Sequence, residues 1–330
     1  MGFKLLLIIV VVITGVLLFV SYKESTALKA QGDLLLQQNK PQEALLYYEE
    51  AKNIFPLRQD VNDDISSVNL LMNSQTEYSQ IVDQEYAESQ TIPLLQNIVP
   101  AALKNGEYFV PILMYHHIRI NPMPASPLWA SLNVDPNLLD SELNYLHTND
   151  FHIITLGDLI KIMNGQEKLP KNPVILTFDD GYEDFYTNAF PLLQKYKMKA
   201  TEFVITQVET APAYLSWDQI VALDKSGLVE IAAHTQHHPF LTDLNATLID
   251  KEIMGSKSDI ESHLGHTVNW FAYPYGAYNN FIVSETQKAG FTGAVSTIYG
   301  AVQSKDKLFL MPRIAADGRF TLDEFIKRIR

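Results

Sequence analysis

Residues 174–181 read VILTFDDG, an apolar run followed by two adjacent carboxylates and a glycine. The run is typical of a buried strand, and Gly181 permits a turn where the strand ends. Asp179 and Asp180 repel each other there, and partial burial raises the pKa of at least one of them. A bound cation would remove that cost. The alternative is that Asp-Gly is a turn signal and that one aspartate caps a helix starting at Glu183.

A second polar cluster, HTQHHP at residues 234–239, follows another apolar strand. His234 and His238 are four residues apart, so a tight loop can bring both imidazoles to one ion. His237 is expected to point elsewhere. One carboxylate and two histidines are typical ligands for a divalent ion with open positions, zinc or another first-row metal. The remaining carboxylate would stay free as a base.

Two further clusters contain aromatic residues and histidine. Residues 271–276 read FAYPYG, which predicts a rigid wall for stacking a sugar and a backbone N–H aimed at the reacting centre. The alternative is ordinary packing at a barrel mouth. Residues 114–117 read MYHH. A lone histidine in such a place is more often structural, but two beside a predicted metal site favour a function.

These clusters belong to a long region in which strands and helices alternate. This order predicts a parallel α/β sheet, most economically closed as a barrel. Barrel enzymes carry their chemistry where strands end, which is where the four clusters stand. The expected helices include 183–197, 217–226 and 246–264, and the eight expected strands are 110–118, 152–156, 174–178, 201–205, 229–233, 268–273, 293–297 and 309–314.

The amino terminus carries a different signal. Residues 5–22 hold no charged side chain, and 18 residues of helix span about 27 Å, enough for a bilayer core. We expect an uncleaved signal anchor at residues 1–24, with Lys4 on the cytoplasmic side and the remainder extracytoplasmic. A cleaved signal peptide, which would make the protein secreted, has only a poor cleavage site at residues 25–27.

Residues 25–100 are expected to be α-helical, ending in a linker rich in proline. Within residues 26–60 the pattern resembles a single tetratricopeptide repeat, a helical hairpin in which Gly32 and Ala44 allow close approach. The alternative is a helical spacer. Because one repeat cannot bury its apolar face alone, the hairpin should pack on the next helix, on the catalytic domain, or on another chain through a protein partner or self-association.

Composition limits the function classes. The chain has 330 residues, 47% of them hydrophobic, so it can bury a core and is not globally disordered. A net charge of −13 argues against nucleic-acid binding. The chain has no cysteine, which excludes disulfides, thiolate nucleophiles and cysteine-ligated zinc.

Together, TFDDG and the HTxxHP motif that follows it resemble the polysaccharide deacetylases of the NodB homology group, carbohydrate esterase family 4. The resemblance covers residues 110–315. It implies a distorted (β/α) barrel at residues 101–330 and removal of acetyl groups from N-acetylglucosamine polymers.

The resemblance also implies residue roles. Asp179 would be the general base, Asp180, His234 and His238 the ligands of one divalent metal ion, and the backbone N–H of Tyr275 an oxyanion donor. Tyr273 and Pro274 would contact the substrate beside it.

Two departures from the common family pattern point to a subgroup. Ala272 stands where many members carry the arginine that holds the base, and no histidine follows His266 to supply the general acid. The enzymes acting on poly-β-1,6-N-acetylglucosamine resemble this chain in both respects, which assigns the acid to His116. Arg313 could replace the missing arginine or bind substrate.

Three functions remain open from the sequence. The first is N-deacetylation of poly-β-1,6-N-acetylglucosamine. The second is deacetylation of peptidoglycan or chitin oligomers. The third is a degenerate carbohydrate-binding or scaffold protein.

Overall fold

The computed structural model describes residues 22–23, 25–33, 41–54, 58, 61–62, 65, 103–104, 106–122, 126–208 and 213–330. The chain divides into two compact units, Met1–Ile92 and Pro93–Arg330, and each is considered by itself. The second unit contains both sequence motifs.

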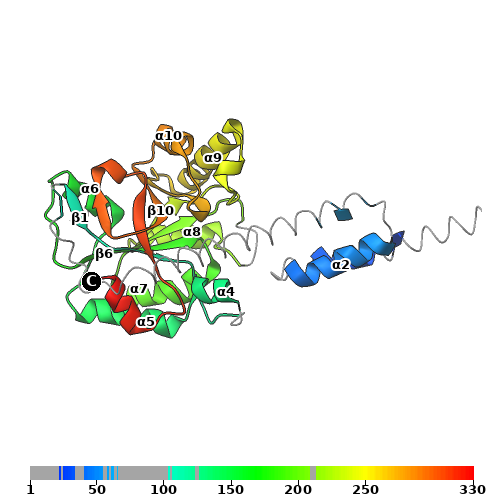
Figure 1. Cartoon of the computed structure of the whole chain (residues 1–330), viewed down its shortest axis with the longest axis horizontal. Coiled ribbons are helices and arrows are strands. Elements are labelled where there is room, and N and C mark those ends of the chain that lie inside the picture. Colours follow the sequence, from blue (N-terminus) through cyan, green and yellow to red (C-terminus); the bar gives the residue numbers. More distant parts are fainter. Residues whose placement is uncertain are drawn as a thin grey trace, which may run out of the picture. The chain divides into compact units, whose positions relative to one another are not determined.

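The second unit is built on a closed ring of seven parallel strands, with helices around it (Figure 1). The ring order is β2-β12-β10-β9-β8-β7-β6, and pairing between β2 and β6 closes it. The strands are β2 (Ile112–Tyr115), β6 (Pro173–Asp180), β7 (Ala200–Val204), β8 (Val229–Ala233), β9 (Trp270–Ala272), β10 (Gly293–Tyr299) and β12 (Met311–Ala315). The predicted α/β barrel is therefore confirmed.

The expectation of eight strands in the ring was wrong. The eighth, β5 (His152–Ile153), pairs in parallel with Pro173 and Val174 at the start of β6. From Ile175 onward β6 pairs with β2 instead. Because β5 is only two residues long and occupies the same edge of β6 as β2, it lies beside the ring without entering it.

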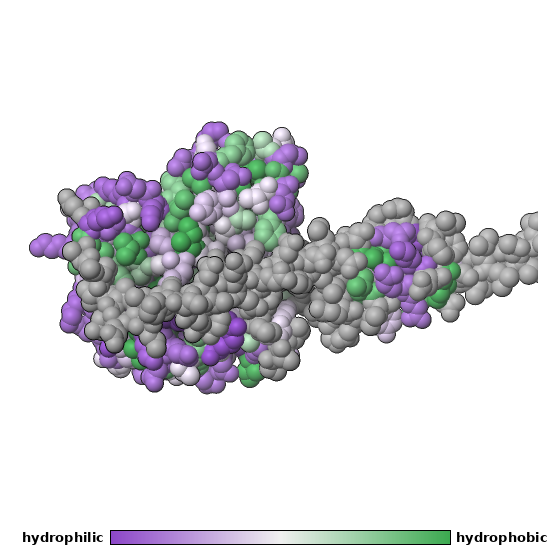
Figure 2. Space-filling model, in the orientation of Figure 1, coloured by the Kyte–Doolittle hydropathy of each residue, from purple (hydrophilic) through white to green (hydrophobic). Residues whose placement is uncertain are grey.

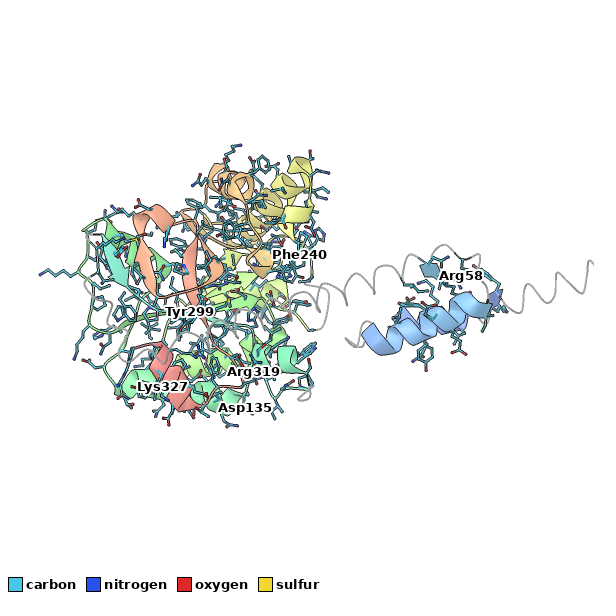
Figure 3. All side chains as sticks on the ribbon, viewed as in Figure 1. Arg58, Asp135, Phe240, Tyr299, Arg319 and Lys327 are labelled. Atoms are coloured by element: carbon cyan, nitrogen blue, oxygen red, sulfur yellow. The ribbon has the colours of Figure 1, made fainter. Side chains whose placement is uncertain are left out.

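The two faces of the barrel strands bury different clusters. One cluster contains Ile112, Ile175 and Phe203 and is completed by residues of α6. The other contains the alternate residues Leu113 and Leu176 together with apolar residues of the surrounding helices. Successive side chains of a strand point to opposite faces, so the first cluster fills the barrel and the second fills the layer beneath the helices. Side chains occupy both regions (Figure 3).

The helices of this unit begin at conventional caps. Thr155, Ser216 and Thr321 each form a capping box, in which the cap hydroxyl and a side chain three residues on bind reciprocal N–H groups. The helices are α4 (Pro127–Leu132), α5 (Pro136–Thr148), α6 (Leu156–Met163), α7 (Phe190–Tyr196), α8 (Trp217–Lys225), α9 (Ala246–Leu264), α10 (Asn280–Lys288) and α11 (Leu322–Arg328).

Predicted helix bounds were accurate where caps are strong. The helix at 246–264 begins after Asn245, ends at Gly265 and is confirmed. The helix expected at 183–197 is confirmed as one continuous helical segment, residues 183–196, with a π-helical turn, Phe185–Ala189, directly before α7. Short strands β1 (Glu107–Phe109) and β11 (Val302–Ser304) pair antiparallel, and β3 (His117–Ile118) pairs with β4 (Asn133–Val134).

Hydrophilic and hydrophobic residues are interspersed over the visible face of the second unit (Figure 2). Its exposed large apolar residues include Ile120, Leu169 and Phe281, which come from separate elements. Scattered residues of this kind are normal on a globular surface.

The first unit contains a helix at residues 25–33 and α2 (Pro41–Ile54). The two helices are in close contact, since a Cβ added at Gly32 would lie 2.6 Å from the Tyr48 ring. The Tyr48 hydroxyl donates to Asp33 at 2.7 Å, and Ser25 donates to the Ala51 carbonyl at 2.8 Å. This is a packed helical pair, and the tetratricopeptide assignment stays a prediction. Among the helices that the structure describes, none is long and apolar enough to cross a bilayer. The predicted anchor at residues 1–24 lies outside the described residues except at 22 and 23.

Candidate active site

The site lies at the carboxyl ends of β6 and β8, where the sequence clusters were expected to meet. Along β6, Ile175 faces the barrel interior and Leu176 the helix layer. The same alternation turns Asp179 inward and Asp180 outward at the end of the strand. Asp180 has a φ of 82°, a left-handed conformation that is unusual for a residue with a Cβ and marks the bend at this point.

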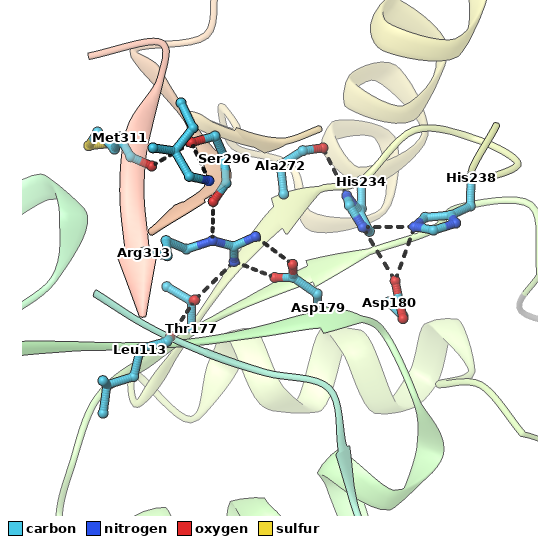
Figure 4. A network of polar contacts seen from close by, with 11 residues as sticks. Leu113, Thr177, Asp179, Asp180, His234, His238, Ala272, Ser296, Met311 and Arg313 are labelled. Atoms are coloured by element: carbon cyan, nitrogen blue, oxygen red, sulfur yellow. Dashed lines mark hydrogen bonds and ion pairs between the residues drawn. The ribbon is translucent and has the colours of Figure 1, made fainter. Parts of the chain in front are cut away.

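Asp179 is held by Arg313 of β12 (Figure 4). The guanidinium donates to both carboxylate oxygens, at 2.8 and 2.7 Å. It also donates to Thr177 Oγ1 at 3.1 Å and to the Ser296 carbonyl at 3.0 Å. Arg313 is only 1% exposed and Asp179 3%. Arg313 therefore faces Asp179 from inside the barrel, rather than facing the surface where a substrate would lie.

Asp180, His234 and His238 converge on one point (Figure 4). Oδ1 of Asp180 lies 3.3 Å from Nε2 of each histidine, and the two Nε2 atoms are 3.1 Å apart. The imidazole of His234 is oriented by the Ala272 carbonyl, which accepts a hydrogen bond from Nδ1 at 2.8 Å. Because a carbonyl can only accept, Nδ1 carries the proton and the lone pair of Nε2 faces the other two groups.

This donor set fits a divalent cation. Oδ1 of Asp180 is buried and has no hydrogen-bond partner. An orphaned carboxylate oxygen beside two imidazole nitrogens is costly unless positive charge is shared among them. Nitrogen and oxygen donors of this kind suit zinc and other first-row metals.

The pKa directions agree with this need for positive charge. Burial acts to raise the pKa of Asp180, but the nearby histidines outweigh it and lower the pKa well below its ordinary value. Burial lowers the pKa of His238 to about 4. For His234 burial acts in the same direction, but the close contact with Asp180 and the negative charges of Asp179 and Asp180 raise its pKa overall. Burial would raise the pKa of Asp179, and Arg313 reverses this and holds it low.

The two adjacent histidines at the first barrel strand have different surroundings. His116 lies between β2 and β3, near enough to Asp180, Asp179 and Arg313 for their charges to affect it, and burial lowers its pKa. His117 is bound into a separate network. Its Nδ1 lies 2.7 Å from Asp184, and its ring stacks on Tyr182 at 3.5 Å.

The FAYPYG segment is divided between core and site. Tyr273 is 1% exposed and packs on Phe271 in the layer beneath the helices, and Pro274 is also buried. Tyr275 has a φ of 58°, and its ring lies 4.4 Å from the His238 ring and stacks on Phe240 at 3.9 Å. Of the three residues of this segment expected to contact substrate, Tyr275 is the one that contacts His238 of the Asp180, His234 and His238 cluster.

Sequence reasoning missed two carboxylates near the site. Glu202 of β7 is fully buried, and its Oε1 accepts the N–H of Gly181 at 3.1 Å. Burial raises its pKa well above the ordinary value. The signal was a glutamate inside the apolar strand ATEFV. Glu252 of α9 binds the loop that carries the histidines.

Comparison with known proteins agrees with this geometry. Residues 166–294 match the family model described as polysaccharide deacetylase. That segment contains TFDDG, HTQHHP and FAYPYG.

Individual relatives extend the similarity. The poly-β-1,6-N-acetyl-D-glucosamine N-deacetylase of Staphylococcus aureus is 29% identical over 252 residues, covering 69% of this chain and 86% of that protein. The Streptococcus pyogenes deacetylase PplD, solved with acetate, is 28% identical with a TM-score of 0.62 over 67% of this chain and 98% of its own. A Bacillus cereus polysaccharide deacetylase is also 28% identical, with a TM-score of 0.61 over 68% of this chain and 70% of its own. The chain thus contains a polysaccharide deacetylase domain of the NodB homology group, carbohydrate esterase family 4.

Proposed function

We propose that the chain is a metal-dependent enzyme that removes N-acetyl groups from N-acetylglucosamine units of a cell-surface polysaccharide, poly-β-1,6-N-acetylglucosamine. The observation that carries the proposal is that two adjacent aspartates have different partners. Asp180 belongs to a cluster fit for a cation, and Asp179 belongs to a buried ion pair that keeps it ionised.

Asp180, His234 and His238 would hold the metal ion. Bound there, a divalent ion supplies Lewis acidity: it polarises the acetyl carbonyl and lowers the pKa of a water molecule. Zinc is the expected ion because the ligands are two imidazoles and one carboxylate.

Asp179 acts as the general base. Its carboxylate is ionised because Arg313 binds both oxygens, so it can accept the proton that the attacking water loses. The N–H of Tyr275 donates to the developing oxyanion, which is worth about 3 kcal/mol for one good donor.

His116 acts as the general acid toward the departing amine. Burial lowers its pKa, and in its protonated form the imidazole gives a proton to the amine nitrogen as the C–N bond breaks. The nearby carboxylates favour its protonated form. The products are acetate and a glucosamine unit, which makes the polymer cationic.

The substrate preference rests on similarity to the Staphylococcus aureus enzyme and on Ala272, which stands where many members of the family carry an arginine.

We also propose that residues 1–24 anchor the chain in the cell membrane, that residues 25–100 form a helical region able to bind a partner or a second copy, and that the domain at 101–330 is extracytoplasmic. Detection of the chain in the membrane fraction, with its carboxyl-terminal region accessible to protease from outside, would support this placement; a protected carboxyl-terminal region would contradict it.

The test is acetate release by the purified full chain loaded with zinc. The substrates are β-1,6-linked N-acetylglucosamine oligomers, chitin oligomers and peptidoglycan, with the Asp179→Asn variant as the blank. Release from the β-1,6 oligomers alone would support the whole proposal. Release only from chitin or peptidoglycan would keep the chemistry and reject the substrate, and no release from any of them would reject the function.

A further inference from the structure

The loop between the two histidine ligands is bound from outside the barrel by helix α9. Glu252 of α9 is only 8% exposed. Its Oε2 accepts the backbone N–H groups of Gln236 and His237, both at 2.9 Å. Its Oε1 lies 2.8 Å from Nδ1 of His237. One carboxylate therefore binds two consecutive residues of the three that separate His234 from His238.

The conformation of this loop needs such support. Thr235 and His238 have φ values of 66° and 57°, in the left-handed region. For residues with a Cβ that region costs about 1–2 kcal/mol each. Within the loop, the N–H of His238 donates to Thr235 Oγ1 at 2.9 Å, but this bond joins the two strained residues to each other and does not fix them to the fold.

The surface of α9 is shaped to receive the loop. A Cβ added at Gly255 would lie 2.5 Å from the Cδ atom of Gln236, so the Gln236 side chain rests against helix backbone. Its amide donates to Asp259 at 2.9 Å. Residues 252, 255 and 259 are spaced by three and four, which places them on one face of the helix.

We propose that Glu252 is a positioning residue for the metal site: by binding the backbone of Gln236 and His237, it fixes His238 where its Nε2 meets Asp180 and His234. This inference rests on the proposed metal site. Glu252 contacts the segment between the two histidine ligands, so removal of its side chain should loosen the position of His238. His234 should stay in place, because the Ala272 carbonyl orients it.

The test compares Glu252→Ala with Asp250→Ala in the full chain. Both changes remove an acidic side chain of α9, and Asp250 is exposed. The measurements are the Kd for Zn²⁺, obtained by competition with a chromogenic chelator, the melting temperature without metal, and kcat and KM for acetate release. Loss of a group that orients a metal ligand typically weakens metal binding about 10- to 100-fold. We expect that weakening, and a lower kcat with little change in KM, for Glu252→Ala and not for Asp250→Ala.

A second variant tests the proposal even if the first does not fold. His237→Ala removes the imidazole partner of Glu252 but keeps both backbone bonds, so it should weaken Zn²⁺ binding by a smaller factor than the loss of the Glu252 side chain. If both variants match the parent in Kd and kcat and only their melting temperatures fall, Glu252 is a structural residue and the proposal is overturned. If the parent binds Zn²⁺ but releases no acetate, the Kd values still decide the role of Glu252 while the proposed function fails. A parent that binds no Zn²⁺ would overturn both.

Discussion

Arg313 reaches Asp179 across an intervening strand. The ring order places β2 between β12, which carries the arginine, and β6, which carries the aspartate. The guanidinium nevertheless binds both carboxylate oxygens from inside the barrel, and Thr177 of β6 accepts a further bond from it. A bidentate pair of this kind fixes direction as well as charge.

Replacing Arg313 should therefore affect both stability and pH dependence. Arg313→Ala leaves a buried carboxylate without its partner, which costs about 3–5 kcal/mol of unfolding free energy. The pKa of Asp179 should rise, because Arg313 is what holds it low. Since the base works only when ionised, the acid limb of the kcat/KM profile should move to higher pH. Urea denaturation and a pH–rate profile measure the two effects.

Arg313→Lys separates charge from geometry. Lysine keeps the positive charge but cannot bind both oxygens, so we expect a smaller loss of stability and a clear loss of kcat. The control is Lys195→Ala, which breaks the exposed pair with Asp140 and should cost less than about 1 kcal/mol. An unshifted acid limb in Arg313→Ala would show that Asp179 is not the titrating base.

Substitutions of Asp179 and His234 should have different effects on turnover and on zinc binding. Asp179→Asn removes the base and should lower kcat by at least about 10²- to 10⁴-fold, while zinc still raises the melting temperature. His234→Ala removes a ligand, so zinc at 100 times the parental Kd, which adds about 2.7 kcal/mol to the parent, should add little. Thermal unfolding with and without zinc distinguishes them. His152→Ala, at an exposed histidine, should behave as the parent; full turnover in either site variant would refute the assignment.

The neighbouring histidines 116 and 117 offer a matched pair. His116→Ala should lower kcat about 10²- to 10⁴-fold with an unchanged Kd for zinc, as expected for loss of a general acid. His117→Ala should chiefly lower the melting temperature, because it removes the contacts to Asp184 and Tyr182. Steady-state kinetics and calorimetry on both proteins check this. If His117→Ala lowers kcat and His116→Ala lowers only the melting temperature, His116 is not the general acid.

Because of Glu142, the stability of the folded state should fall as the pH rises. It is buried on α5, accepts a bond from the Tyr115 hydroxyl at 2.9 Å, and burial raises its pKa from 4.5 to about 8. Between those values the folded state holds a proton that the unfolded state has lost, so stability falls as pH rises through this range and the full cost is present above pH 8.

Glu142→Gln should abolish that dependence. The amide oxygen can still accept the tyrosine hydroxyl but never ionises. We expect equal urea midpoints for variant and parent at pH 4.5 and a more stable variant at pH 9, by up to about 5 kcal/mol. Glu167→Gln, at an exposed residue, should match the parent throughout. A parent whose midpoint is constant from pH 5 to 9 would contradict the prediction.

The barrel and the position of its site followed from simple rules. TFDDG and HTxxHP each end an apolar strand, and in a parallel barrel those ends share one mouth. That argument is enough to bring Asp180 to His234, although the two lie in different motifs. The helical pattern at 246–264 also predicted the span of α9, which in the structure is bounded by an asparagine cap and a glycine.

What the sequence could not provide was contact between distant residues. The number of strands in the ring depends on whether β5 or β2 occupies one edge of β6, which no local pattern decides. Tyr273 is buried and Tyr275 is partly exposed, because the backbone turns at Tyr275, which has a left-handed φ. Glu252 lies on a helix with no motif of its own, and only the folded structure brings its carboxylate to the loop.

The place of β12 in the ring has a consequence for synthesis. Its neighbours are β10 and β2, and β2 is the first barrel strand in the chain. The barrel therefore cannot close, and Asp179 cannot gain its counter-ion, until Arg313 has left the ribosome. Since domains fold as their chains emerge, a nascent chain lacking this strand has two open sheet edges and an uncompensated carboxylate in its core. The buried ion pair of Asp179 and Arg313 should thus form late, with the closure of the barrel.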